Sequence, residues 1–180
     1  ATDASNNVFL AGYTPSTDLL PPPIGPGQSG PNWAGTAVNN ASAGTVAWGT
    51  PGNAAGSNAA DHAVTGSITA NARSNYLQAT NFGIAVPAAN IVTGVQVQVE
   101  WLASGTSATD YAIYLVKGGV IQSGAANKSI NTAIGTAQTT RTYGSSVDTW
   151  GVSLTPADVN AANFGVAIAV TRPSGGGSPT

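Results

Sequence analysis

The most regular pattern of hydrophobic and polar positions lies in residues 91–104, with the sequence IVTGVQVQVEWLAS. Apolar residues occupy one parity (Val95, Val97, Val99, Trp101) and polar residues the other (Gln96, Gln98, Glu100). This alternation predicts a β-strand with one buried face. Residues 111–117, YAIYLVK, are apolar at both parities and predict a central strand that is covered on both faces.

Shorter segments with the same character predict further strands. They are residues 45–49, 62–68, 74–80 and 164–172, with a short or edge strand in 142–151. Gly118 and Gly119 follow the strand at 111–117, where a two-residue hairpin turn needs positive φ. In residues 164–172 one face carries large apolar residues, and the other carries Gly165, Ala167 and Ala169. Small residues there would allow a close approach by another layer or chain.

One segment predicts a helix, near residues 155–161. Thr155 is a suitable N-cap, Pro156 suits the first helical position, and Asp158 lies where a carboxylate meets the helix N-terminus. Short strands with Gly and Pro between them and a single short helix predict an all-β fold. We expect an antiparallel, jelly-roll-like β-sandwich.

The first 44 residues differ from the rest of the chain. Six of the eleven prolines lie between Pro15 and Pro31, which predicts an extended arm rather than a core strand. Large apolar side chains in the same stretch favour an arm docked on a surface over a disordered tail. The expected anchors to a partner are Val8, Phe9, Leu10, Tyr13, Leu19, Leu20, Ile24 and Trp33. The predicted organisation is an arm at 1–44, a β-sandwich at 45–172 and a flexible tail at 173–180.

Charged residues make up only 7% of the chain, against roughly 25% in ordinary domains. With a net charge of −2 and scattered Lys and Arg, the sequence offers no basic patch for nucleic acid. Such a surface is either simply neutral and polar or largely covered by partners. There is no Cys, so we expect neither disulfides nor thiolate metal sites. No apolar run is long enough for a membrane helix, and no signal peptide is visible.

The residues that could carry chemistry are few. His62 beside Asp61 is the sole histidine, and no nucleophile motif accompanies it, so we expect no catalytic role. One His without Cys cannot build a usual zinc site, and a calcium site would need carboxylates from distant loops. A glycosidase pair of Glu100 and Asp110 is disfavoured because Glu100 falls on the polar face of its strand. We therefore predict no catalytic residue, no metal and no cofactor.

The tryptophans raise one binding hypothesis. Trp33, Trp48, Trp101 and Trp150 could form a platform on which a sugar stacks. Trp101 shares a face with three valines and is better explained as core. Trp48 and Trp150 each stand beside a glycine at a strand end, so they either cap the fold or form the platform.

The tripeptide Asn-Phe-Gly occurs twice, at 81–83 and 163–165, each time before alternating small and branched residues. We expect each copy to start a core strand, with Phe82 and Phe164 pointing inward. Gly83 and Gly165 would permit a bulge or a close approach.

These motifs, together with NYLQATNFGIAVP, YLVKGG, YGSSVDTWG and TPADVNAANFG in that order over residues 45–170, resemble a β-sandwich domain of bacteriophage virion proteins. The resemblance is strongest to capsid decoration (cement) proteins, and similar domains occur in tail and fibre components. It implies a non-enzymatic structural protein on the capsid exterior of a virion. The implied partners are the major capsid protein and copies of the chain itself, as a homotrimer. The alternative is a tail-fibre or surface module that binds host glycans.

The chain departs from this resemblance in two places. Proteins of this type continue past the final FGVA strand into another strand, whereas here TRPSGGGSPT follows. The Pro-rich arm is not covered by the resemblance either. An uncovered strand edge invites pairing, so we expect the arm, from the same chain or from a neighbour, to complete the sheet.

Overall fold

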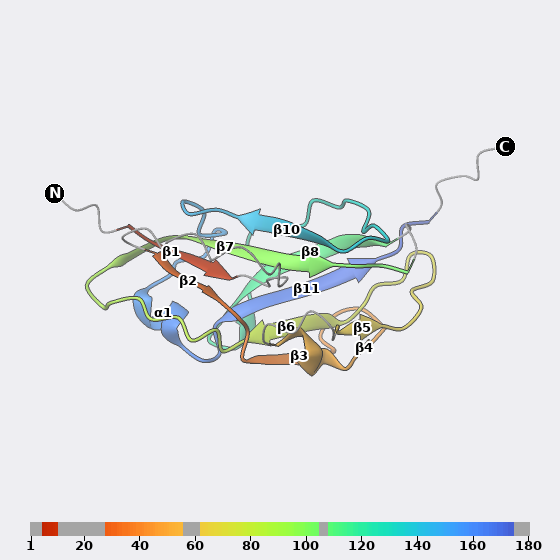
Figure 1. The fold of residues 1–180 in the computed structure, drawn as a ribbon, viewed down its shortest axis with the longest axis horizontal. Coiled ribbons are helices and arrows are strands. Elements are labelled where there is room, and N and C mark those ends of the chain that lie inside the picture. The colour runs from red at the N-terminus through yellow and green to blue at the C-terminus, as the bar shows by residue number, and fades with distance from the viewer. Residues whose placement is uncertain (1–4, 11–27, 56–61, 105–107, 175–180) are drawn as a thin grey trace.

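A computed structural model describes residues 5–10, 28–55, 62–104 and 108–174 (Figure 1). These residues form eleven β-strands, one α-helix and one short 3-10 helix. The prediction of a mostly β protein with one short helix is confirmed, and most strand pairs are antiparallel. No helix in these ranges combines the length and the apolar character needed to cross a membrane.

One sheet has four strands in the order β10-β7-β1-β2. Its long strand is β7 (Ile91–Trp101), which pairs antiparallel with β10 (Thr139–Gly144). On the other side β7 pairs parallel with β1 (Ser5–Leu10), and β1 pairs parallel with β2 (Gln28–Asn32). The parallel pairs depart from the antiparallel prediction. They are feasible because residues 11–27 make a connection long enough for a parallel crossover.

The other main sheet has five strands in the order β3-β6-β11-β8-β9, and all of its pairs are antiparallel. Their bounds are β3 Thr36–Asn40, β6 Tyr76–Thr80, β11 Gly165–Thr171, β8 Thr109–Lys117 and β9 Val120–Ile121. The central strand β11 is buried along its whole length. In Figure 1 strands β11, β6 and β3 of this sheet lie below β7 and β10.

Two regions predicted as full strands are shorter. Residues 45–49 contribute only β4 (Trp48–Gly49), and residues 62–68 only β5 (Val64–Thr65), which pairs with β4. Between them the 3-10 helix η1 (Pro51–Ala54) follows Thr50, whose φ is 45°. Proline at the start of this turn cannot continue a strand ladder, which explains why the chain leaves the sheet here.

The inner faces of the two sheets meet in one hydrophobic core. Val95 and Val97 of β7 lie in the same cluster as Ile113 and Leu115 of β8, and all four are at most 1% exposed. The alternation predicted for residues 91–104 is therefore confirmed, and so is the core position of Trp101. Burying side chains of this size stabilises the fold by about 1.5–3 kcal/mol each.

The local predictions at the turn and the helix are confirmed. Gly118 and Gly119 have φ of 59° and 82° and join β8 to β9. Helix α1 (Pro156–Asn160) begins with a capping box: Thr155 Oγ1 accepts from the Asp158 backbone N–H, and Asp158 Oδ2 accepts from the Thr155 N–H at 2.8 Å.

The two Asn-Phe-Gly copies have different roles. The second leads into β11, with Phe164 fully buried, but the first follows the end of β6 and enters irregular chain, where Phe82 is half-buried. Antiparallel pairing sets Gly165 opposite Thr80, so the copies flank the same strand pair. A Cβ on Gly165 would lie 1.9 Å from the Ala79 carbonyl oxygen, whereas Gly83 faces open space and has φ of 62°. One glycine permits a close approach and the other a left-handed turn.

The expected open edge at the last strand does not exist. β11 is flanked by β6 and β8, so no place for a further strand remains beside it. The arm pairs instead with β7 of the other sheet. Residues 36–40, which we assigned to the arm, form β3 of the five-stranded sheet, and Ala37 is buried there. On one side β3 pairs antiparallel with β6. Residues 36–40 contain no proline, so each of their backbone N–H groups is able to donate a hydrogen bond in a sheet.

Candidate functional site

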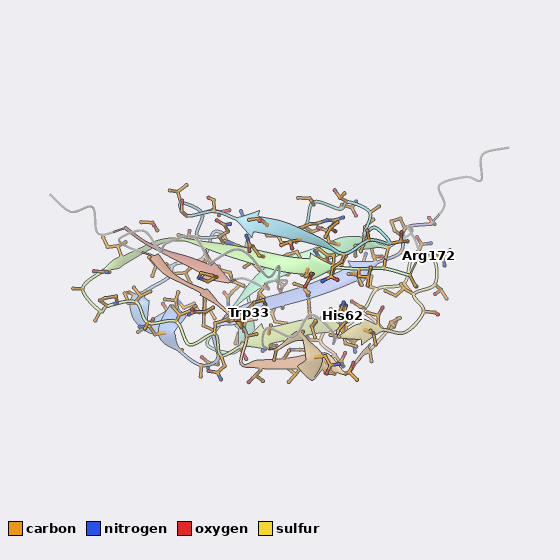
Figure 2. All side chains as sticks on the ribbon, viewed as in Figure 1. Trp33, His62 and Arg172 are labelled. Carbon is orange, nitrogen blue, oxygen red and sulfur yellow. The ribbon has the colours of Figure 1, made fainter. Side chains whose placement is uncertain are left out.

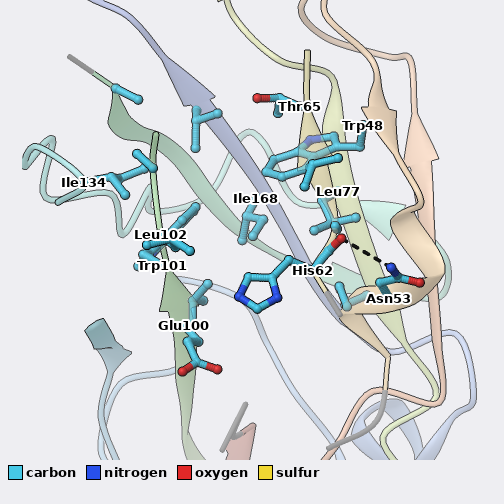
Figure 3. A pocket seen from close by; sticks show the side chains of 18 of the residues that line it. Trp48, Asn53, His62, Thr65, Leu77, Glu100, Trp101, Leu102, Ile134 and Ile168 are labelled. Atoms are coloured by element: carbon cyan, nitrogen blue, oxygen red, sulfur yellow. Dashed lines mark hydrogen bonds between the residues drawn. The ribbon is translucent and has the colours of Figure 1, made fainter. Parts of the chain in front are cut away.

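A cleft of about 1130 Å³ lies between the two sheets, lined by residues that the structure describes. Strands β7 and β11, β6, and the β4–β5 region contribute its walls. In Figure 3 Trp48 and Leu77 stand on one side, Trp101 and Ile134 on the other, and Ile168 lies between them. These side chains are buried and apolar, so the cleft presents mainly hydrophobic surface.

Trp48 is fixed on its wall by two hydrogen bonds. Its indole Nε1–H donates to the Asn75 carbonyl oxygen at 2.8 Å, and its backbone N–H donates to Asn39 Oδ1 at 2.8 Å. Because the indole N–H is already used inside the protein, Trp48 offers the cleft only its hydrocarbon surface.

The opposite wall is held by a buried polar network. Trp101 Nε1–H donates to the Tyr143 hydroxyl at 2.9 Å, and that hydroxyl donates to Asp110 Oδ2 at 3.2 Å. Burial, together with the Asp110 carboxylate, raises the pKa of Tyr143 to about 12. The phenol therefore stays protonated at neutral pH and can both accept from the indole and donate to the carboxylate.

Asp110 is completely buried, and its carboxylate is fully used. It forms an ion pair with Arg141 at 3.2 Å and accepts from the backbone N–H groups of Ile130 and Thr132 at 2.9 and 2.8 Å. Arg141 also donates to the carbonyl oxygens of Thr132 and Ala133. The network thus joins β8, β10 and the loop at residues 129–133, and it has a structural role.

Glu100 lies at the cleft and accepts a hydrogen bond from Gln138. Glu100 and Asp110, which the sequence analysis considered as a glycosidase pair, therefore bind different partners. The other titratable residues along the cleft, among those the structure describes, are His62 and Arg172 (Figure 2). In Figure 3 the His62 imidazole reaches into the cleft beside Glu100, while its carbonyl accepts from Asn53. Within the same ranges no three His, Asp or Glu side chains gather as a metal site would require. The cleft is suited to holding an apolar group.

The tryptophan platform is wrong for Trp48 and Trp150. Their side chains are 9% and 1% exposed, and Trp150 donates its Nε1–H to the Val95 carbonyl oxygen at 2.8 Å. Both are core residues because the irregular chain around them folds inward. Trp33 is half-buried and lines the cleft.

Apart from Trp33, the predicted arm anchors fall into two groups. Val8, Phe9 and Leu10 belong to β1, of which the structure describes the backbone pairing. Tyr13, Leu19, Leu20 and Ile24 lie outside the described residues.

Sequence reasoning missed a group of aromatic residues on the outer face of the five-stranded sheet. Tyr76, Tyr111 and Tyr114 surround a second, smaller hollow together with Arg73. Tyr111 and Tyr114 are three residues apart and would face opposite ways in a regular strand. The register of β8 against β11 shifts between Val170 and Ala169, opposite Asp110 and Ala112, so that both tyrosines share the outer face. No sequence signal marks this bulge.

Comparison of the chain with protein-family models, with curated proteins and with solved structures found no match.

Proposed function

We propose that this chain is a non-enzymatic structural protein of a phage particle, and specifically a capsid decoration protein of the jelly-roll-like β-sandwich type. Its partners in this proposal are the major capsid protein and further copies of the chain, assembled as a homotrimer on the capsid exterior. The sequence resemblance supplies the class, and the placement of the arm supplies a mechanism.

The observation that carries the proposal is the backbone pairing of β1. Residues 5–10 add a parallel strand beside β7, and β2 then forms the edge of the sheet. Pro31 lies in β2, where an edge position tolerates a residue that cannot donate a hydrogen bond. The N-terminal residues are thus held through main-chain hydrogen bonds, which any exposed strand can offer.

This mode of attachment can be exchanged between molecules. A strand that pairs with β7 of its own chain can pair with β7 of a neighbouring copy, because the two sites are identical. On a capsid, arms exchanged in this way would link neighbouring subunits across the joints of the shell. A chain with only 7% charged residues brings little electrostatic repulsion to such crowded contacts.

The test compares two paired substitutions in β1. Val8→Pro with Phe9→Pro removes two consecutive backbone donors, so at least one loss falls on the ladder with β7. Val8→Ala with Phe9→Ala keeps the backbone donors and removes only the large side chains. Each protein is mixed with undecorated capsids of the phage that encodes the chain, and bound protein is measured by co-sedimentation.

We expect the proline pair to reduce capsid binding by at least tenfold and to shift a trimer towards monomer in light scattering. The alanine pair should reduce binding less. Far-UV circular dichroism should show that both variants keep the β fold. Undiminished binding by the proline variant would refute the arm mechanism, and failure of the unmodified chain to bind capsids would refute the decoration role.

A further inference from the structure

The outer face of the five-stranded sheet carries a hollow of about 140 Å³ that shares no lining residue with the cleft. Its floor is made of small side chains, Ala112 of β8 and Ala169 of β11, which are opposite each other in register. Both are 2% exposed, although no strand layer of the described chain covers this face. The tyrosines standing around them account for their burial.

Three tyrosines form the walls. Tyr76 of β6 and Tyr114 of β8 meet edge to face, with ring centroids 6.4 Å apart and planes at 73°. Tyr111 stands at the bulge on the same face and is half-buried, as is Tyr114. Within the described part of the chain no hydrogen bond involves any of the three hydroxyl groups. Burial raises the pKa of Tyr76, so its phenol remains a donor at neutral pH.

Arg73 supplies a positive charge at one end of the hollow. Its guanidinium lies over the Tyr111 ring, 4.0 Å from the centroid. Lys117, Lys128 and Arg141 each form an ion pair with a carboxylate. Among the described carboxylates none pairs with Arg73. Contact with the ring holds the guanidinium in place, and within the described part of the chain no hydrogen bond uses its N–H groups, which can therefore receive an anion.

The rim is closed by the loop after β3. A Cβ on Gly44 would lie 2.0 Å from the Ser74 carbonyl oxygen, so glycine is needed for this loop to approach the β6 region. The Thr45 and Val46 N–H groups donate to the Arg73 carbonyl oxygen at 3.0 and 3.1 Å. The backbone beneath Arg73 is therefore fixed, and the hollow is formed before any ligand binds.

We propose that this hollow binds one pyranose ring carrying a carboxylate, as found in acidic glycans. A cavity of about 150 Å³ holds one benzene ring, so the volume here fits a single six-membered ring. Tyrosine rings offer apolar faces to the C–H groups of a sugar, and their hydroxyls offer hydrogen bonds. Arg73 supplies the fork of donors that a carboxylate fits.

The concave shape favours a small ring over a second copy of the chain. A stable protein interface buries about 800 Å² on each partner, far more than the wall of a hollow for one ring. The inference does not depend on the decoration role. It places the glycan hypothesis on tyrosines of the outer face instead of on tryptophans.

The test is a titration of the full chain with glucuronic acid, followed by two-dimensional NMR, with glucose as the neutral probe. Arg73→Gln removes the charge, and Tyr114→Phe removes one hydroxyl while keeping the ring. Arg172→Gln is the matched control, because Arg172 is another described cation without a carboxylate ion pair but lines the cleft instead.

We expect resonances of Tyr111, Ala112 and Ala169 to shift with glucuronic acid and much less with glucose. Arg73→Gln should weaken glucuronic acid binding by about tenfold or more, as loss of a charge-assisted hydrogen bond does. Tyr114→Phe should weaken it by a smaller factor, and Arg172→Gln should leave it unchanged.

The proposal is overturned if glucuronic acid shifts no resonance of this face, or if glucose binds equally well. It is also overturned if Arg172→Gln weakens binding as much as Arg73→Gln, since that would indicate a general charge effect. Shifts on this face that depend on protein concentration alone would assign it to a second copy of the chain.

Discussion

The two main sheets take strands from interleaved parts of the chain but pair them by different rules. In the five-stranded sheet every pair is antiparallel, and the central strand β11 is buried throughout. In the four-stranded sheet only β7 and β10 pair in this way, and β1 and β2 join as parallel strands from the N-terminal region. The central strand of the first sheet is buried on both faces, whereas in the second sheet β1 and β2 are described by their backbone pairing.

This difference distinguishes strands that share the hydrophobic core from strands whose attachment is described by backbone pairing. Strands β7 and β10 belong with the five-stranded sheet energetically, because their inner side chains share its core and Arg141 and Tyr143 of β10 bind Asp110 of β8. Strands β1 and β2 join this unit through the backbone pairing of β1 with β7. The following changes test the division, beginning with the link between the sheets.

Asp110→Ala removes the carboxylate that joins β8 to β10. It leaves Arg141, the Tyr143 hydroxyl and two backbone N–H groups without their acceptor. Breaking a buried pair from one side costs about 3–5 kcal/mol, so we expect a loss of this size in the free energy of unfolding. Denaturant titration measures it.

Glu100→Ala is the control for this change. Glu100 is also a carboxylate on a strand, but it is only half-buried and its hydrogen bond is with Gln138 at an exposed position. We expect a loss within about 1 kcal/mol. Equal losses for the two variants would show that the Asp110 network does not link the sheets.

Gly165→Ala and Gly83→Ala compare the two Asn-Phe-Gly copies. At Gly165 the new Cβ would meet backbone atoms of β6, which cannot move without separating β6 from β11. Overpacking of this kind costs about 1–3 kcal/mol, and a backbone obstacle places it at the upper end. At Gly83 there is space, and only the φ of 62° is unfavourable, costing about 1 kcal/mol. Thermal unfolding of both variants should rank Gly165→Ala as the more damaging; the reverse order would contradict the close approach of β6 and β11.

The helix at the end of the five-stranded sheet should give the smallest effect, and a pH-dependent one. A hydrogen bond from the Thr155 side chain, with further help from Lys117, holds the pKa of Asp158 below its ordinary value of 3.8. Because the folded pKa is the lower one, this stabilisation is complete above the ordinary pKa and is lost as the pH falls through the folded pKa.

Asp158→Asn should therefore lower the free energy of unfolding at neutral pH by about 1 kcal/mol or less. It should also flatten the fall in stability below pH 3.8. Urea titrations at neutral and acidic pH measure both effects. An unchanged acid limb in the variant would show that Asp158 does not contribute to it.

Local features of the fold were predictable from the sequence because they depend on neighbouring residues. The strand at 91–101, the glycine turn at 118–119 and the capped helix after Thr155 each follow from spacing and from residue type. The pairing of β1 with β7 was not predictable, because nothing in a strand's own sequence names a parallel partner far along the chain.

The candidate sites were predicted less well than the fold. The glycines beside Trp48 and Trp150 left open whether these residues cap the fold or form a platform, and both use their indole N–H groups on buried carbonyl oxygens. Asp110 enters the sequence analysis only as a partner of Glu100 in a disfavoured glycosidase pair, yet it is fully buried in a network of its own. In each case a long-range hydrogen bond decides the environment, and no residue adjacent in sequence reveals it.

The shifted register in β8 has a consequence for how this protein can change by mutation. Because one extra residue on β8 resets the alternation, Asp110 faces inward with Val170 while Tyr111 joins the tyrosines outside. Deleting Tyr111, the residue of β8 without a register partner, would restore strict alternation while Asp110 stays opposite Val170 and faces inward. Point substitutions can tune the inner network or the outer hollow separately. Loss of the extra residue would likewise remove one wall of the outer hollow and keep the inner network, so the hollow can be gained or lost without the network.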